Sequence, residues 1–172
     1  MTENLPEFHH QAELAEAIAN QEEKDISEGV VLAVYSALAS GNAEGVGQLV
    51  AEDLEWWFHG PPSQRHLMRM LTGVDRLCTY SFVPQRMYTI GSKVFAEGKS
   101  DTSKGCWVHI WTVKDGLIME LRECFNTSVT VTEVHCDLKP SHHQASDLLN
   151  IQSTLWQSEL SGLSMPGLIL AV

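Results

Sequence analysis

Trp107-Val108-His109-Ile110-Trp111 is the stretch of sequence that decides the fold of this chain. Successive side chains of a β-strand point to opposite faces, so the two indoles and the imidazole share one face, while Val108 and Ile110 lie on the other. Both faces are mostly apolar, which predicts a strand that is buried on both sides. An imidazole flanked by indoles is unusual as core filling and suggests the wall of a cavity.

The negative charge of the chain is concentrated at its N-terminal end. The 172 residues carry a formal net charge of −11, and residues 1–28 contribute −7 through eight acids and Lys24. The remainder has no basic stripe, so we expect neither nucleic acid nor an anionic membrane surface as a partner. No apolar run reaches the ~20 residues of a membrane span, and there is no signal peptide, which predicts a cytoplasmic or nuclear protein.

Cysteine and histidine spacing gives no sign of a metal centre. The four cysteines show no Cys-x-x-Cys spacing, and the pairs His9-His10 and His142-His143 fall in the expected tails. We therefore expect no metal and no cofactor.

The order of the remaining patterns predicts helices first and strands afterwards. Apolar residues recur at helical spacing over 30–38, Asn42 is placed to cap a second short helix, and a third begins at Ser63. One short strand is expected at 54–58, and only strands are expected over 81–134. This is an α+β plan with an acidic arm at 1–28, a domain at 29–134, and a linker with an apolar C-terminal segment at 135–172.

The hairpin around Lys114-Asp115-Gly116 decides which side chains meet. A three-residue loop pairs Val113 with Leu117, so that His109 faces Leu121 and Trp107 faces Glu123. A two-residue Asp-Gly turn slips the register and turns Glu120, Arg122 and Cys124 toward the indoles instead. We favour the first register, because it groups Leu121 and Phe125 with the aromatic residues.

Four motifs resemble the plant wound-induced, senescence-associated protein family. They are Leu-Glu-Trp-Trp-Phe-His-Gly-Pro-Pro at 54–62, Leu-Thr-Gly at 71–73, Trp-Val-His at 107–109 and Arg-Glu-Cys-Phe-Asn-Thr at 122–127. That family resembles a branch of the nuclear transport factor 2-like (SnoaL-like) superfamily. The resemblance implies a cone-shaped α+β fold with N-terminal helices packed on a strongly curved antiparallel sheet, a fold that hosts enzymes and non-enzymes.

On the favoured register, one concave face collects the candidate site residues. The face carries Trp107, His109, Trp111, Leu121, Glu123 and Phe125, closed by Tyr35 and by Trp56 or Trp57. The resemblance implies that His109 and Tyr35 lie near the groups that stabilise an oxyanion in isomerase relatives. It also implies that the general base is absent or replaced by His59, since its position falls near Phe58 or His59. The alternative reading is a neutral core histidine hydrogen-bonded to Tyr35 or Glu123.

Three functions follow from these residues. The first is an accessory protein that holds an apolar, terpenoid-like metabolite and assists a biosynthetic partner enzyme. The second is a cofactor-free isomerase, cyclase or dehydratase that uses Tyr35, His109 and Glu123. The third is a structural dimer of the stress response. A homodimer is expected under all three, because Cys106, Val108 and Ile110 form an outer face that is too apolar for water.

Overall fold

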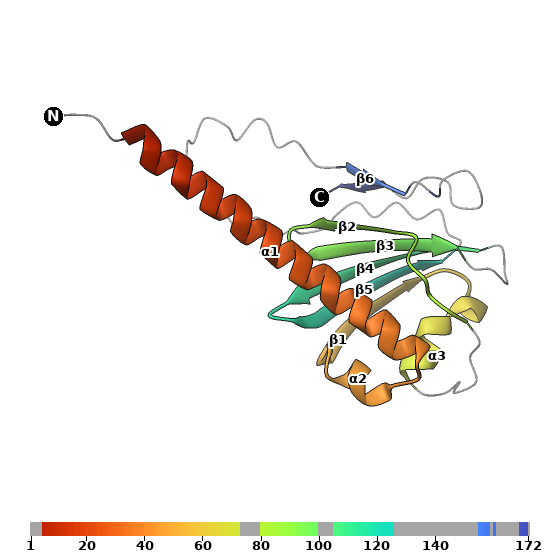
Figure 1. Ribbon diagram of the computed structural model, residues 1–172. Helices are drawn as coiled ribbons and strands as arrows, with labels where there is room; N and C mark the ends of the chain where they lie inside the picture. Colours follow the sequence, from red (N-terminus) through yellow and green to blue (C-terminus); the bar gives the residue numbers. More distant parts are fainter. Residues whose placement is uncertain are drawn as a thin grey trace.

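A computed structural model describes residues 5–72, 80–99, 105–125, 155–158, 160 and 169–171 of the chain (Figure 1). The helices are α1 (Leu5–Ala39), α2 (Ala43–Gly47) and α3 (His66–Leu71), with a 3-10 turn at Pro62–Gln64 before α3. The strands are β1 (Val50–His59), β2 (Arg86–Ile90), β3 (Lys93–Lys99), β4 (Cys106–Lys114), β5 (Leu117–Phe125), β6 (Leu155–Gln157) and β7 (Ile169–Ala171). The order of helices and then strands confirms the α+β prediction.

Helix α1 crosses one face of the sheet and also runs beyond it (Figure 1). Its C-terminal part buries Val31, Val34 and Tyr35 against the strands. The helix ends at Ala39, and Gly41, with a φ of 66°, turns the chain so that the Asn42 N–H donates to the Ala37 carbonyl at 2.8 Å. The boundary predicted at residue 28 lies inside this single helix, because helical hydrogen bonding continues through the acidic segment.

Asn42 caps α2 as predicted. Its side-chain oxygen accepts from the Gly45 N–H at 2.9 Å, which satisfies one of the donors that a helix N-terminus leaves free. The chain then enters β1, which begins at Val50 and is longer than the strand expected at 54–58.

The main sheet has the strand order β1-β5-β4-β3-β2 and is mixed rather than wholly antiparallel. The four strands β2 to β5 form an antiparallel meander, whereas β1 pairs with β5 in parallel. The prediction of an antiparallel sheet is therefore wrong for β1. Strand β1 precedes α3 in the chain but lies beside the last strand of the meander, so no hairpin sets its direction.

The hairpin between β4 and β5 differs from the favoured register. Asp115 and Gly116 both have positive φ, 51° and 77°, as a two-residue type I′ turn requires, and Lys114 pairs with Leu117. A bulge next to Val113 then shifts the register by one more residue, so His109 faces Glu123 rather than Leu121. Relative to the favoured register, the two-residue turn alone would place Glu120, Arg122 and Cys124 on the inner face. The bulge returns Leu121, Glu123 and Phe125 to that face.

Both faces of the central strands are buried. The inner face, toward α1, carries the aromatic core, while Cys106, Val108 and Ile110 on the outer face are at most 2% exposed. Two buried residues near β6 are Ser158 and Leu160, and the Ser158 hydroxyl donates to Glu97 Oε2 on the outer face at 2.6 Å. The outer-face residues Cys106, Val108 and Ile110, from which the homodimer was predicted, are thus buried within the single chain, and the homodimer stays a prediction.

Candidate functional site

His109 lies at the centre of a hydrogen-bonded chain on the inner face. Its Nδ1 is 2.7 Å from the Tyr35 hydroxyl, and its Nε2 is 3.4 Å from Glu123 Oε1. The Trp111 indole N–H donates to the Tyr35 oxygen at 3.0 Å. His109, Glu123 and Trp111 are 0% exposed, so these contacts form away from water.

The chemistry of the donors assigns a direction to this chain. An indole N–H can only donate, so the Tyr35 oxygen accepts from Trp111. A carboxylate can only accept, which assigns the imidazole proton to Nε2 beside Glu123 and leaves Nδ1 to accept from the Tyr35 hydroxyl. Burial, opposed by the Trp111 bond and reinforced by the Glu123 charge, raises the pKa of Tyr35 well above its ordinary value. Tyr35 therefore stays a phenol at neutral pH.

Aromatic rings surround the imidazole. Ring centroids of Trp107 and Phe82 lie 4.7 and 4.8 Å from that of His109, and Phe82 meets Trp107 edge-on at 5.3 Å. Gly98 makes room for the Trp107 indole, since a Cβ at that position would lie 2.7 Å from Trp107 Cε2. The resulting environment around His109 is apolar except for Tyr35 and Glu123.

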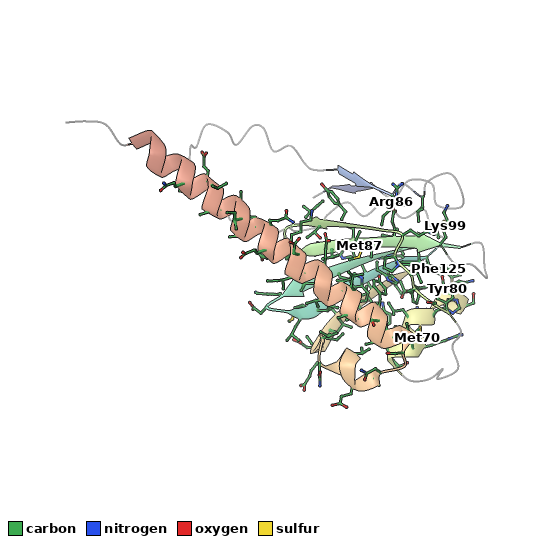
Figure 2. All side chains as sticks on the ribbon, in the orientation of Figure 1. Met70, Tyr80, Arg86, Met87, Lys99 and Phe125 are labelled. Atoms are coloured by element: carbon green, nitrogen blue, oxygen red, sulfur yellow. The ribbon has the colours of Figure 1, made fainter. Side chains whose placement is uncertain are left out.

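A second aromatic group lies at the α3 end of the same face. The rings of His66 and Tyr80 stack at 4.3 Å, and Tyr80 lies 6.0 Å from Phe125. Figure 2 shows Tyr80 and Phe125 close together beside α3, with Met70 on the α3 side. Gly60 lets the chain pass Phe125, because a Cβ there would lie 2.7 Å from the Phe125 carbonyl oxygen.

Several polar atoms on this face lack a hydrogen-bond partner among the described residues. They are Glu123 Oε2, Trp107 Nε1 and Trp56 Nε1. Phe58 lies directly opposite Glu123 on β1, so the residue that faces this carboxyl group on the neighbouring strand has no donor side chain. A buried carboxylate oxygen without a donor is costly, and a donor brought by a ligand or by water would relieve it.

The structure brings together eight of the ten predicted site residues. The shared inner face carries Tyr35, Trp56, Trp107, His109, Trp111, Leu121, Glu123 and Phe125. Sequence reasoning did not assign Phe82, Tyr80, His66 or Phe58 to this face. The alternation Tyr80-Ser81-Phe82 was the available signal, but this segment precedes β2 instead of forming part of a strand from residue 81.

Trp57 and His59 lie on the outer face, apart from the other eight predicted site residues. They alternate with Trp56 and Phe58 along β1, and Trp57 is 52% exposed beneath the Arg122 guanidinium, 5.9 Å from its ring. His59 pairs with Cys124, and burial together with the Arg122 charge lowers its pKa. Burial and the Glu123 charge, opposed by Arg122, raise the pKa of the Cys124 thiol to about 12.

The described residues contain neither a metal-binding cluster nor a helix suited to cross a membrane. No three His, Cys, Asp or Glu side chains within the described residues are grouped to hold a metal ion. The described helices also include none with the length and apolar character that a membrane crossing needs.

Comparisons with known proteins place this chain among plant stress proteins. A family model described as "Wound-induced protein WI12" matches residues 68–172. Senescence associated gene 20 of Arabidopsis thaliana is 35% identical over 118 residues, and Wound-induced protein 1 of Solanum tuberosum is 37% identical over 114. Each alignment covers 61% of this chain and 100% of the relative.

One solved structure shares the fold, and another gives a weaker superposition. Bal32a, from a soil-derived mobile gene cassette, superposes with a TM-score of 0.50 at 18% identity, over 60% of this chain and 91% of its own. A nuclear transport factor 2-like protein of Burkholderia xenovorans gives a TM-score of 0.47 at 19% identity, over 59% and 89%. The chain belongs to the wound-induced protein WI12 family and has the α+β fold of the nuclear transport factor 2-like superfamily.

Proposed function

We propose that the inner face binds an apolar small molecule of the terpenoid type, and that the protein is a non-catalytic accessory factor for a biosynthetic enzyme. The observation that carries this proposal is Glu123 Oε2, which is buried on an aromatic face without a hydrogen-bond partner among the described residues. Aromatic walls with a few fixed polar groups are typical of sites for small apolar ligands. A ligand that bears a hydroxyl group supplies the missing donor.

Two features favour binding over chemistry. The position that the resemblance implies for a general base carries Phe58 on the inner face, and His59 lies on the outer face. The Tyr35 hydroxyl already bonds to His109 and Trp111, so it has no hydrogen left to donate to a substrate oxygen.

The ligand proposal is tested with matched terpenoid alcohols and ketones, such as borneol and camphor, by titration calorimetry. We expect the alcohol to bind about tenfold more tightly, because only the alcohol donates a hydrogen bond to the carboxylate. Glu123→Gln should remove this preference, whereas Glu120→Gln, on the outer face of the same strand, should retain it. Absence of binding across a terpenoid panel would contradict the proposal.

The accessory role is tested by co-precipitation with terpenoid-modifying enzymes of wounded or senescent tissue. A partner whose product yield rises when this protein is added supports the role. A monodisperse protein that binds neither enzyme nor ligand contradicts it.

A second candidate is a cofactor-free proton-transfer enzyme, and the Tyr35–His109–Glu123 chain favours it. His109 holds Glu123 through Oε1, which leaves Oε2 free to take a proton from a bound substrate. Turnover of the same compounds by the purified protein, followed by mass spectrometry, tests this role. If His109→Ala and Glu123→Ala leave the rate unchanged, the enzymatic assignment fails.

A further inference from the structure

Residues 11–23 of α1 lie outside the packed body that the described residues form. All side chains of residues 11–23 are exposed, and Figure 1 shows this part of the helix running past the sheet. Contact with the body begins where the Lys24 ammonium lies 6.0 Å from the Tyr88 ring and Thr89 donates to Glu28 at 2.7 Å. Among the described residues, the helical extension formed by residues 11–23 is thus joined to the body at its C-terminal end.

The extension exposes large apolar side chains. Leu14, Ile18 and Ile26 are 57%, 52% and 61% exposed. At about 100° per residue, Leu14 and Ile18 lie one turn apart, and all three are on the half of the helix that faces away from the side of Val31 and Val34. The extension thus presents its apolar side chains to solvent and not to the sheet.

Acidic side chains lie on all sides of the same stretch of helix. At about 100° per residue, Glu22 and Asp25 share the side of Leu14 and Ile18, whereas the other acids of the extension lie on the opposite side. Residues 11–28 hold six acids and Lys24, a net charge of −5. The exposed acids of the extension and its base are Glu13, Glu16, Glu22, Glu23 and Asp25. A helix without tertiary contacts is only marginally stable in water, and closely spaced acids repel one another, so this segment gains stability from a partner.

We propose that residues 11–26 of α1 dock into an apolar groove with a lysine- or arginine-rich rim on a different protein. Exposed apolar residues one turn apart are the anchors of helix-in-groove recognition, and Glu22 and Asp25 on the same side match a basic rim. A second copy of this chain fits poorly, because pairing two extensions would bring the same net −5 charge together. The surface is independent of the inner face, so its test needs no ligand and stands apart from that of the proposed function.

The test uses the full-length chain as bait in extracts of wounded leaf tissue at low and high salt. One variant replaces the apolar anchors (Leu14→Ser with Ile18→Ser), and another reverses the two acids on the same side (Glu22→Lys with Asp25→Lys). The matched control reverses two exposed acids elsewhere, Glu44→Lys with Asp53→Lys. Val83→Ser with Leu117→Ser controls for loss of exposed apolar surface, and circular dichroism verifies helix content.

We expect one basic protein to be captured by the wild type and by both controls, with about tenfold weaker binding for both α1 variants. The purified partner should bind more weakly as salt rises, and reversing its rim charges should restore binding of the lysine variant. Equal binding of α1 variants and wild type overturns the proposal. So does the absence of any α1-dependent partner, or an α1-dependent homodimer in analytical ultracentrifugation.

Discussion

Glu120 and Glu123 lie on opposite faces of β5, and their carboxyl groups differ greatly in how many hydrogen-bond donors they have. On the outer face, Glu120 Oε1 accepts from Arg122 at 2.7 Å, and Oε2 accepts from Lys93 at 3.2 Å and Thr112 at 3.0 Å. On the inner face, Glu123 has His109 at 3.4 Å on one oxygen and, among the described residues, nothing on the other. The more deeply buried carboxyl group is thus the less satisfied one.

This difference separates a structural carboxylate from a candidate binding group. In the partly buried ion-pair network of Glu120, both carboxylate oxygens have donors, so the network needs no further partner. A buried oxygen without a donor is retained against its free-energy cost, which is the pattern expected where a ligand supplies the donor. Burial alone does not distinguish the faces, since Val108 and Trp107 are both 0% exposed.

Removing an inner-face indole should have the largest effect. Trp107→Ala leaves a cavity beside His109 and Phe82, and we expect a loss of about 3–5 kcal/mol in the free energy of unfolding. Trp57→Ala on the outer face should lower it by under about 1 kcal/mol, because that ring is half exposed and loses mainly its contact with Arg122. Urea denaturation measures both, and equal losses would contradict the assignment of the two faces.

Breaking the hydrogen-bonded chain of Tyr35, His109 and Glu123 should have the second-largest effect on the free energy of unfolding. His109→Ala leaves the Tyr35 hydroxyl and the Glu123 carboxyl group without their shared partner, and we expect a loss of about 3 kcal/mol. Tyr35→Phe retains the His109–Glu123 contact and should lower the free energy of unfolding by about 1–3 kcal/mol. A Tyr35→Phe effect larger than that of His109→Ala would show that His109 is not the centre of the chain.

Loss of the Ser158 hydroxyl tests how the outer face is covered. Ser158→Ala removes the 2.6 Å hydrogen bond to buried Glu97, and thermal unfolding should report a loss of about 1–3 kcal/mol. Ser40→Ala is the control, since Ser40 is exposed and should change stability by no more than about 0.5 kcal/mol. An unchanged Ser158→Ala protein would mean that this contact does not hold the region near β6 on the sheet.

The contribution of Glu120 to the free energy of unfolding should be the smallest of these effects, and it should depend on pH. Burial raises the pKa of Glu120, but the hydrogen bonds from Arg122, Lys93 and Thr112 and the Lys93 charge outweigh it, so the folded-state pKa lies below the unfolded value. The stabilisation is complete above the unfolded pKa and is lost as pH falls through the folded pKa. Glu120→Gln should therefore lower stability at neutral pH by under about 1 kcal/mol and flatten its decline at acidic pH. A steeper acid decline in the variant would contradict this sign.

Much of the inner face could be predicted from local patterns. Period-two alternation placed Trp107, His109 and Trp111 on one face of a strand, and the Asn42 cap and the helical spacing over 30–38 placed the α1–α2 corner. Such patterns act over a few residues, because the strand pleat and the helix turn are local geometries. The same local logic identified the α+β plan.

Contacts between distant segments could not be predicted in this way. The two-residue turn and the bulge at Val113 both differ from the favoured loop, and the correct face for Leu121 and Glu123 was reached because the two shifts cancel. The parallel pairing of β1 sent His59 and Trp57 outward, and the segment at 80–82 added Phe82 to the inner face.

The sequence by itself determined which residues alternate, where helices end and which strands are apolar on both faces, because these follow from backbone geometry over one or two turns. Only the tertiary structure decided that Glu123 meets His109, that Ser158 meets Glu97 and that α1 extends past the sheet. These depend on register, strand order and helix length, which are selected by the free energy of packing segments far apart in the chain.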